Sequence, residues 1–482
     1  MLYNPDKHIV EETNDGLAIF DKAKTTLIKF TPNEATTCYE IPGGITTIDR
    51  AAFKDCNKLE EITIPNSVSA IKAFAFSNCS SLSAIKLPEG LKKICEGTFK
   101  RCVNLSEIVI PNKVISIGNQ AFARCENLRT IRLPDTIETI GSRAFYDCEK
   151  LRDVILPKNL KAITKEMFSG CKSITHITLP GSIKTIRSDA FFLCTDLREI
   201  IIKSGVDAIE DEAFKSCENI STIYIPDSLT HIGSDVFDDC HNLKEIIVDE
   251  NNPQYSSMDG VLYNKDMTSL LVCPPSKETI TIPDSVKTIT MYSFWASVIE
   301  EIKISPNVSE IEPHSFEFCY NLEKITVDKT NPVYCSIDGV LFSKDKSCLL
   351  FFPQGKKGSY YIPNTTNTIK HGAFTDSKLT DIIIPNSVKY IEYDAFFLCF
   401  YLHHIIIPQS VVSVGENVFC SCRELKTVTL KSLIPPLCEK QSELFFDCIN
   451  LQSIFVPSKA VEAYKNAPGW KEYASFITPI EH

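Results

Sequence analysis

Apolar residues recur at fixed positions in a unit of 23 residues along most of this chain. One unit begins at Ile64-Pro65 and ends where the next begins, at Leu87-Pro88. The stretch before each proline has the form L-x-x-I-x-I, and its alternation of apolar and polar positions is typical of a half-buried strand. Proline ends the strand because it lacks an amide donor and its φ is fixed. Each unit therefore predicts one short strand of a long parallel sheet.

The rest of the unit predicts a turn and a return path. The polar pair Asn66-Ser67 turns the chain, and a V-x-x-I stretch brings it back along the opposite side. The segment A-F-x-x-C, here Ala75 to Cys79, is interpreted as a single helical or 3₁₀ turn. A unit of this length can bury its apolar positions only against its neighbours, so the array is stable as a stack and its ends need caps. The predicted fold is a repeat solenoid of about fifteen coils.

The register of the units divides the chain into segments. It holds through nine units, although Ile202-Lys203 replaces the apolar-proline pair in the eighth. The expected segments are an N-terminal cap with a degenerate hairpin at 1–40, nine regular coils at 41–248, a hairpin insertion at 249–281, two coils at 282–327, a second hairpin insertion at 328–361, further coils at 362–457 and a C-terminal cap at 458–482. Two insertions thus interrupt the stack.

The two insertions match each other at an offset of 79 residues. The first contains Asn252-Pro253-Gln254-Tyr255 followed by Asp259-Gly260, and the second contains Asn331-Pro332-Val333-Tyr334 followed by Asp338-Gly339. Asp-Gly between apolar stretches indicates a β-hairpin. Calcium binding is an alternative for these Asp and Asn residues, but the spacing of a calcium loop is absent, so turn chemistry is favoured. A weaker third copy, Asp15 to Phe20, opens the chain and is expected to cap it.

The chain has 20 cysteines, and thirteen of them occupy the last position of the F-x-x-C segment. From Cys56 to Cys240 they follow one another at intervals of 23 residues. Because a buried cysteine behaves as a small apolar residue, this spacing predicts a ladder of free thiols inside the solenoid. Disulfides and metal ligation are the alternatives. Zinc is disfavoured because no C-x-x-C pair occurs, Cys420 and Cys422 being the closest pair.

Composition and charge narrow the classes of function. With 44% hydrophobic and 23% charged residues among 482, the chain has an ordinary globular composition, and its net charge of −11 argues against nucleic-acid binding. No apolar run approaches the roughly 20 residues of a membrane helix, and the first residues lack the pattern of an export signal. A protein that stays inside the cell and a secreted protein whose leader was removed both fit, so the compartment is left open.

The unit L-x-x-I-x-I-P-x-x-V-x-x-I-x-x-x-A-F-x-x-C, with the N-P-x-Y and D-G-V-L motifs of the insertions, resembles the BspA-like leucine-rich repeat family over nearly the entire chain. The end of the chain is similar to the tail of that family, and Tyr464 and Trp470 are expected on a helix that caps the last coil. The resemblance implies a right-handed superhelix with a parallel sheet on its concave face. It also implies a surface or secreted protein that binds host matrix proteins such as fibronectin and fibrinogen, or aggregates with other cells.

The two residues that flank the central isoleucine of each strand point outward, onto the predicted concave face. In the nine regular coils, acids hold the first of these positions in every other strand, and exposed aliphatic residues hold the second at the same interval. The candidate partner-binding residues are Glu107, Val109, Arg132, Asp153, Ile155, His176, Glu199, Ile201, Tyr224, Glu245 and Ile247. Two interpretations are open. One is cross-strand pairing, in which Lys86 and Arg132 compensate neighbouring acids, and the other is a contact surface with an exposed apolar stripe.

No catalytic arrangement is recognised in the sequence. His176, His403 and His404 lie near the predicted face without a nucleophile and an orienting acid, no glycine-rich phosphate loop occurs, and no cofactor or metal is expected. We expect a non-catalytic module that binds a protein, such as an extracellular matrix protein or another cell-surface protein. An intracellular scaffold is the first alternative, favoured by the many unpaired cysteines. A carbohydrate-binding module is the second, although Tyr224 is the one aromatic candidate residue. The sequence does not fix the oligomeric state.

Overall fold

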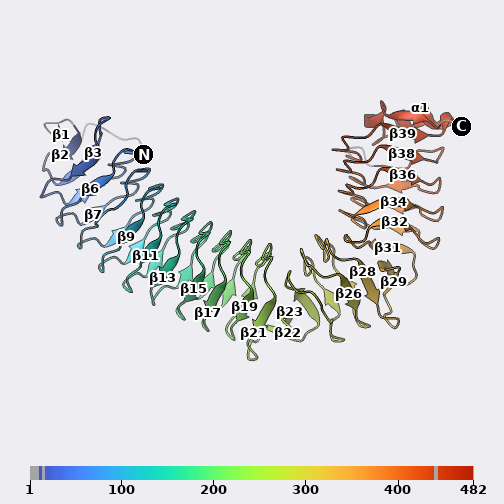
Figure 1. Ribbon diagram of the computed structural model, residues 1–482, viewed down its shortest axis with the longest axis horizontal. Helices are drawn as coiled ribbons and strands as arrows, with labels where there is room; N and C mark the ends of the chain where they lie inside the picture. Colours follow the sequence, from blue (N-terminus) through green and yellow to red (C-terminus); the bar gives the residue numbers. More distant parts are fainter. Residues whose placement is uncertain (1–9, 13–16, 439–442, 481–482) are drawn as a thin grey trace. The chain divides into compact units, whose positions relative to one another are not determined.

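The structure is a computed structural model that describes residues 10–12, 17–438 and 443–480. It divides into two compact units, Met1–Lys265 and Asp266–His482, which are described separately. Both units are stacks of coils in which a longer strand and a shorter strand each pair in parallel with their equivalents in neighbouring coils (Figure 1). These stacked parallel strands, with very little helix, confirm the predicted repeat solenoid. The residues Asp15-Gly16 of the expected third hairpin copy lie outside the described part of the chain.

In the first unit, the L-x-x-I-x-I stretches form a row of parallel strands, here called the long strands. They are β4 (Cys38–Glu40), β6 (Glu61–Thr63), β9 (Glu107–Val109), β11 (Thr130–Arg132), β13 (Asp153–Ile155), β15 (His176–Leu179), β17 (Glu199–Ile202), β19 (Thr222–Ile225) and β21 (Glu245–Val248). Neighbours are offset by one repeat, so that Arg132 lies between Val109 and Ile155. From β6 to β21 the central residue of each strand is buried and the two flanking residues face outward, as the alternation predicts, whereas Tyr39 at the centre of β4 is half-buried.

The V-x-x-I stretches of the first unit form a second row of parallel strands, here called the short strands. They are β5 (Thr47–Ile48), β7 (Ala70–Ile71), β8 (Lys93–Ile94), β10 (Ser116–Ile117), β12 (Thr139–Ile140), β14 (Ala162–Ile163), β16 (Thr185–Ile186), β18 (Ala208–Ile209) and β20 (His231–Ile232). Before them, β1 (Val10–Glu12), β2 (Ala18–Asp21) and β3 (Thr26–Phe30) pair in antiparallel order, and β3 then pairs in parallel with β5. The hairpin of β22 (Tyr255–Met258) and β23 (Val261–Asn264) follows β21.

The second unit repeats the same plan. Its long strands are β26 (Glu301–Ile304), β28 (Lys324–Val327), β32 (Gly358–Tyr361), β34 (Leu379–Ile383), β36 (His404–Ile407), β38 (Thr427–Leu430), β39 (Ser453–Val456) and β40 (Ile477–Pro479). Its short strands are β24 (Ser269–Val272), β25 (Thr288–Ile289), β27 (Glu310–Ile311), β31 (Cys348–Phe351), β33 (Thr368–Ile369), β35 (Tyr390–Ile391) and β37 (Ser413–Val414). The second insertion contributes the hairpin of β29 (Tyr334–Ile337) and β30 (Val340–Ser343).

The A-F-x-x-C segment forms turns with the bonds of the predicted 3₁₀ alternative, from an amide to the carbonyl three residues back, and no continuous helix. In the coil of Phe53, the amides of Lys54 and Cys56 donate to carbonyls three residues back, at 3.2 Å each. The amides between them donate to the next coil, that of Phe53 to the carbonyl of Ala75 at 2.8 Å. Asp55 reaches this geometry with a φ of 67°, in the left-handed region. A helix would use its amides within the segment and leave none for the neighbouring coil.

Two side-chain ladders fill the interior of the first unit. Nine phenylalanines, from Phe53 to Phe237, stack with ring centroids 5.1 to 6.3 Å apart. From Cys79 to Cys240, the cysteine of each F-x-x-C segment donates its thiol to the carbonyl of the phenylalanine one coil earlier. The sulfur and the carbonyl oxygen lie 3.1 to 3.2 Å apart. The cysteines of this ladder, from Cys56 to Cys240, are all buried, which confirms the predicted ladder of buried thiols. Burial raises the pKa of the Cys102 thiol to about 12.

The asparagine of each N-P-x-Y motif forms hydrogen bonds that hold the insertion to the preceding coil, where the stacking is interrupted. Asn252 is fully buried, and its Nδ2 donates to the carbonyls of Pro226 (2.7 Å) and Leu229 (2.9 Å). Its Oδ1 accepts the amides of Gln254 and Tyr255. Asn331 makes the same four bonds in the second unit. The predicted hairpins follow in both copies, with Asp259 and Asp338 in the left-handed region as an Asp-Gly turn requires.

The two aromatic residues expected to cap the last coil, Tyr464 and Trp470, are buried at the end of the second unit. Tyr464 lies in α1 (Val461–Asn466), between the short helices η2 (Ser458–Ala460) and η3 (Lys471–Tyr473). Its hydroxyl donates to the carbonyl of Ser432 (3.2 Å), and the indole of Trp470 donates to that of Pro436 (2.9 Å). The strand β40 then pairs in parallel with β39, an additional strand that the repeat pattern does not predict.

The four bonds of Asn252 predict a stability effect that its neighbour does not share. Asn252→Ala leaves buried carbonyls and amides without partners, and we expect it to lower the free energy of unfolding by about 3 kcal/mol. Asn251→Ala is the matched control, because Asn251 is exposed. Urea unfolding of both variants measures the difference. Equal effects of the two substitutions would contradict the assigned role of Asn252.

The thiol ladder predicts a loss of stability in mild alkali. The pKa of an unfolded thiol is about 8.5, whereas burial raises the pKa of Cys102 to about 12. The unfolded chain therefore releases a proton that the native thiol keeps, so the contribution of this thiol to the free energy of unfolding is constant below about pH 8.5 and falls as the pH rises further. Urea unfolding at pH 7.0 and 9.5 measures this slope. Cys102→Ala should reduce it by up to about 1.4 kcal/mol per pH unit, and an unchanged slope would contradict a buried neutral thiol.

Candidate functional site

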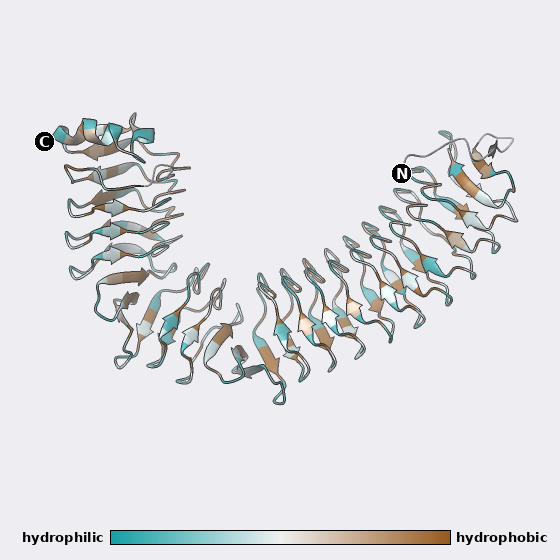
Figure 2. Ribbon diagram, turned by 180° about the vertical axis from the view of Figure 1, so that it is seen from behind, coloured by the Kyte–Doolittle hydropathy of each residue, from teal (hydrophilic) through white to brown (hydrophobic). Residues whose placement is uncertain are grey.

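The candidate residues of the first unit lie on one surface, the outward side of the long strands from β6 to β21, here called the strand face. All eleven of them are exposed. Val109 is 74% exposed and Ile155 is 71% exposed, which is high for aliphatic side chains in a sheet. Figure 2 shows hydrophobic and hydrophilic residues alternating within the coils. The strand backbone thus holds apolar side chains toward solvent on a rigid base.

The register of the strands places the candidate residues in rows that repeat every second coil. Glu107 and Asp153 flank Thr130, while Val109 and Ile155 flank Arg132. Farther along, Tyr224 lies beside Ile247 in the same way. Coils spaced by about 4.8 Å put equivalent side chains of alternate coils about 10 Å apart. The apolar side chains therefore form an interrupted row and not a continuous stripe.

A row of cations lies beside the acids. The sequence prediction did not include it, because that prediction considered only the two residues that flank the central isoleucine. Its members directly precede the first outward position and are exposed: Arg129, Arg152, Arg198 and Lys244. In three coils a cation, an acid and an isoleucine follow one another across the strand, as in Arg152, Asp153 and Ile155. The recurrence of Arg or Lys before the acid is the sequence pattern that would have revealed this row. The strand face is consequently mixed in charge.

Polar contacts on the strand face are few and exposed. The Nε2 of His176 lies 3.9 Å from a carboxylate oxygen of Glu199, and both side chains are largely exposed, so this pair contributes little to stability. Tyr224 donates its hydroxyl to Asp249 at 2.5 Å, a bond that raises the pKa of Tyr224 and lowers that of Asp249. In the described residues, neither Lys86 nor Arg132 forms an ion pair with an acid. The predicted pairing of these two cations with acids on neighbouring strands is thus not among the observed contacts.

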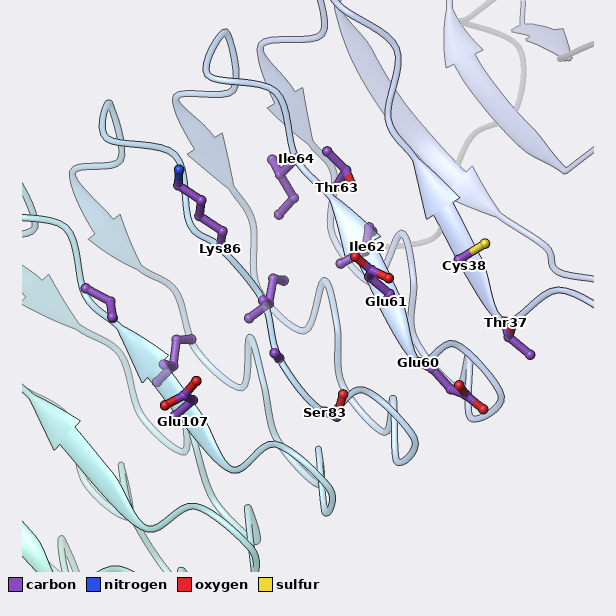
Figure 3. A pocket seen from close by; sticks show the side chains of 14 residues that line it. Thr37, Cys38, Glu60, Glu61, Ile62, Thr63, Ile64, Ser83, Lys86 and Glu107 are labelled. Atoms are coloured by element: carbon purple, nitrogen blue, oxygen red, sulfur yellow. The ribbon is translucent and has the colours of Figure 1, made fainter.

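A hollow of about 810 Å³ opens on the strand face over β4, β6 and β9 (Figure 3). Ser83 and Ala84 line it from the coil between β6 and β9, and their small side chains leave the space open. Its charged lining consists of the carboxylates of Glu60, Glu61 and Glu107 and the ammonium of Lys86. The exposed Cys38 lies at its edge. The hollow therefore favours a positively charged group of a partner.

None of the helices in the described part of the chain has the length and apolar character needed to cross a bilayer. A family model described as the BspA type leucine rich repeat region (6 copies) matches residues 30–152, 115–244, 272–347 and 351–467. Among curated proteins, none matches this chain.

Solved structures of leucine-rich repeat proteins are similar to the chain. One from Bacteroides ovatus has 23% identity over 99% of this chain and 100% of that chain, with a TM-score of 0.46. A leucine rich cell surface protein from Faecalibacterium prausnitzii has 22% identity over 95% and 94%, with a TM-score of 0.44. A protein from Eubacterium ventriosum has 24% identity over 58% and 68%, with a TM-score of 0.42.

The ranges that the family model matches lie over the stacked coils of both units. Leucine-rich repeats build extended surfaces that serve in protein interaction. The chain belongs to the family of BspA-type leucine-rich repeat proteins.

Proposed function

We propose that this protein is a non-catalytic module that binds another protein through the strand face of its first unit. The observation that carries the proposal is the exposure of Val109 and Ile155 on either side of Arg132. Burying an aliphatic side chain of this size stabilises a complex by about 1.5 to 3 kcal/mol. Val109 and Ile155, together with the less exposed Ile201 and Ile247 on the same face, are the proposed anchors of the partner.

The rigidity of the strand face supports the same proposal. Each outward side chain extends from a strand whose central residue is buried and whose backbone pairs with other coils. Binding therefore orders little of the module itself, which reduces the entropic cost of association. The rows of cations and acids supply specificity and register, because misplaced like charges would oppose each other. A partner that makes a contact every second coil, about 10 Å apart, meets all these rows in turn.

The proposed partner is an extracellular matrix protein or another cell-surface protein, with the module acting as an adhesin. This part of the proposal rests on the family resemblance. An intracellular scaffold is the second candidate, and the observation in its favour is that the buried cysteines from Cys56 to Cys240 and the exposed Cys38 form no disulfide. Free thiols persist where the compartment is reducing. The two candidates share the binding surface and differ in the source of the partner.

A capture experiment tests the surface and the source together. The purified chain is presented with matrix proteins and, separately, with a lysate of its own cells. The variant Val109→Glu, Ile155→Lys, Ile201→Glu, Ile247→Lys should lose at least tenfold in capture, because charged groups replace the apolar anchors. Capture of fibronectin or fibrinogen supports the adhesin, and capture from the lysate alone supports the scaffold.

A matched variant controls for the number and charge of the substitutions. Ile115→Glu, Leu433→Lys, Ile434→Glu, Leu437→Lys alters four exposed apolar residues outside the strand face. It should keep full capture and, like the first variant, an unchanged circular dichroism spectrum. Equal losses in both variants, or capture that neither variant affects, would contradict the strand face as the binding surface.

A further inference from the structure

The second insertion interrupts the stacking of short strands within the second unit. β27 pairs with β25, whereas the next short strand, β31, pairs with β33 and with the hairpin strand β30. In place of a neighbouring strand, the hydroxyl of Tyr334 accepts the amide of Ile311 at 3.1 Å. Ile311 is consequently only half-buried, although Ile289 and Ile369 at the same position of other coils are fully buried. The core is therefore open at this coil.

This opening is a cavity of about 210 Å³. Its apolar lining consists mainly of Ile311, Phe316, Tyr334, Leu341, Leu350 and Phe351. The ring centroids of Phe316 and Phe351 lie 5.3 Å apart, with the two ring planes inclined by 49°. An apolar cavity of about 150 Å³ admits a benzene ring. The cavity of the second unit is therefore large enough for a ring that carries a short side chain.

A buried polar group in the lining lacks a partner. Gln354 is 1% exposed, and its Nε2 donates to the carbonyl of Thr375 at 3.1 Å. Because that carbonyl can only accept, the bond fixes the orientation of the amide. Its Oε1 then has no hydrogen-bond donor among the described residues. A buried acceptor without a partner is costly, so a ligand that brings a donor gains by satisfying it.

The charged groups of the lining also favour a donor that carries positive charge. Glu312 and Glu317 both line the cavity. One oxygen of Glu312 accepts the amide of Met291 (2.7 Å), and one oxygen of Glu317 contacts His314 (2.5 Å). Lys370 is the one ammonium in the lining, and it is bound to Glu392 at 2.7 Å. Carboxylates and aromatic faces both attract cations, the latter through the ring quadrupole.

We propose that this cavity binds a small primary ammonium compound that carries an aromatic ring. The ring packs against Phe316 and Phe351, and the ammonium donates to Oε1 of Gln354 in a lining whose carboxylates are Glu312 and Glu317. No residue of the strand face takes part. The site thus adds a small-molecule function to the proposed protein binding and is testable apart from it.

Titration calorimetry of the full chain at pH 7 tests the proposal with 2-phenylethylamine as the probe. We expect saturable binding of one molecule per chain, and at least tenfold weaker binding of phenylacetate, which has the same ring but the opposite charge. Gln354→Leu removes the unpaired acceptor and should weaken the amine at least tenfold. The double variant Glu312→Gln, Glu317→Gln should weaken the amine and leave phenylacetate unchanged or tighter.

Glu323→Gln is the matched control, since Glu323 is exposed on the same coil and does not line the cavity. It should bind the amine as the unmodified chain does. If Gln354→Leu does not fold, the double variant Glu312→Gln, Glu317→Gln still tests whether the cavity binds the amine, because both glutamates are partly exposed. Absence of saturable amine binding, equal binding of phenylacetate, or equal weakening by the control would overturn the proposal.

Discussion

The backbone hydrogen bond between successive coils is the interaction on which the rest of this structure depends. In the turn segments, the amides of Phe53, Phe76 and Phe99 donate to carbonyls 22 residues ahead at 2.8 to 2.9 Å. Because the same bond recurs at the same offset, every position of one coil lies over its equivalent in the next. Phenylalanine stacks on phenylalanine, and each thiol meets the phenylalanine carbonyl of the coil before. The outward positions form rows for the same reason.

The insertions show what this constraint requires when the period is broken. Side chains take over bonds that the backbone of a neighbouring coil would otherwise make: Asn331 satisfies four backbone groups, and the hydroxyl of Tyr334 accepts the amide of Ile311. These substitutes satisfy hydrogen bonds without restoring the packing of the core. A cavity beside Phe316 and Phe351 is the result. The proposed ligand site is thus a consequence of how the chain accommodates an insertion.

The sequence predicts those features that depend on period alone. Strand positions, the burial of the central isoleucines and the exposure of residues such as Val109 follow from alternation. The hairpins follow from the Asp-Gly pairs. The turn of A-F-x-x-C follows in its bonds to the carbonyl three residues back. Its alternate amides bond to the next coil, which the local sequence does not show. The contact of Tyr224 with Asp249 and the pairing of β40 with β39 also join residues that the repeat does not relate.

The central claim is that a coil of 23 residues is the unit of folding and that each coil depends only on its neighbours. Deletion of residues 130–152 tests this claim most directly, because it removes one whole period and joins Arg129 to Asp153 in register. Circular dichroism and urea unfolding should show a folded chain with an unchanged spectrum per residue. Deletion of residues 130–140 removes half a period, and should disrupt the coils beside the deletion and lower the urea midpoint of unfolding. Equal damage by both deletions would contradict the account.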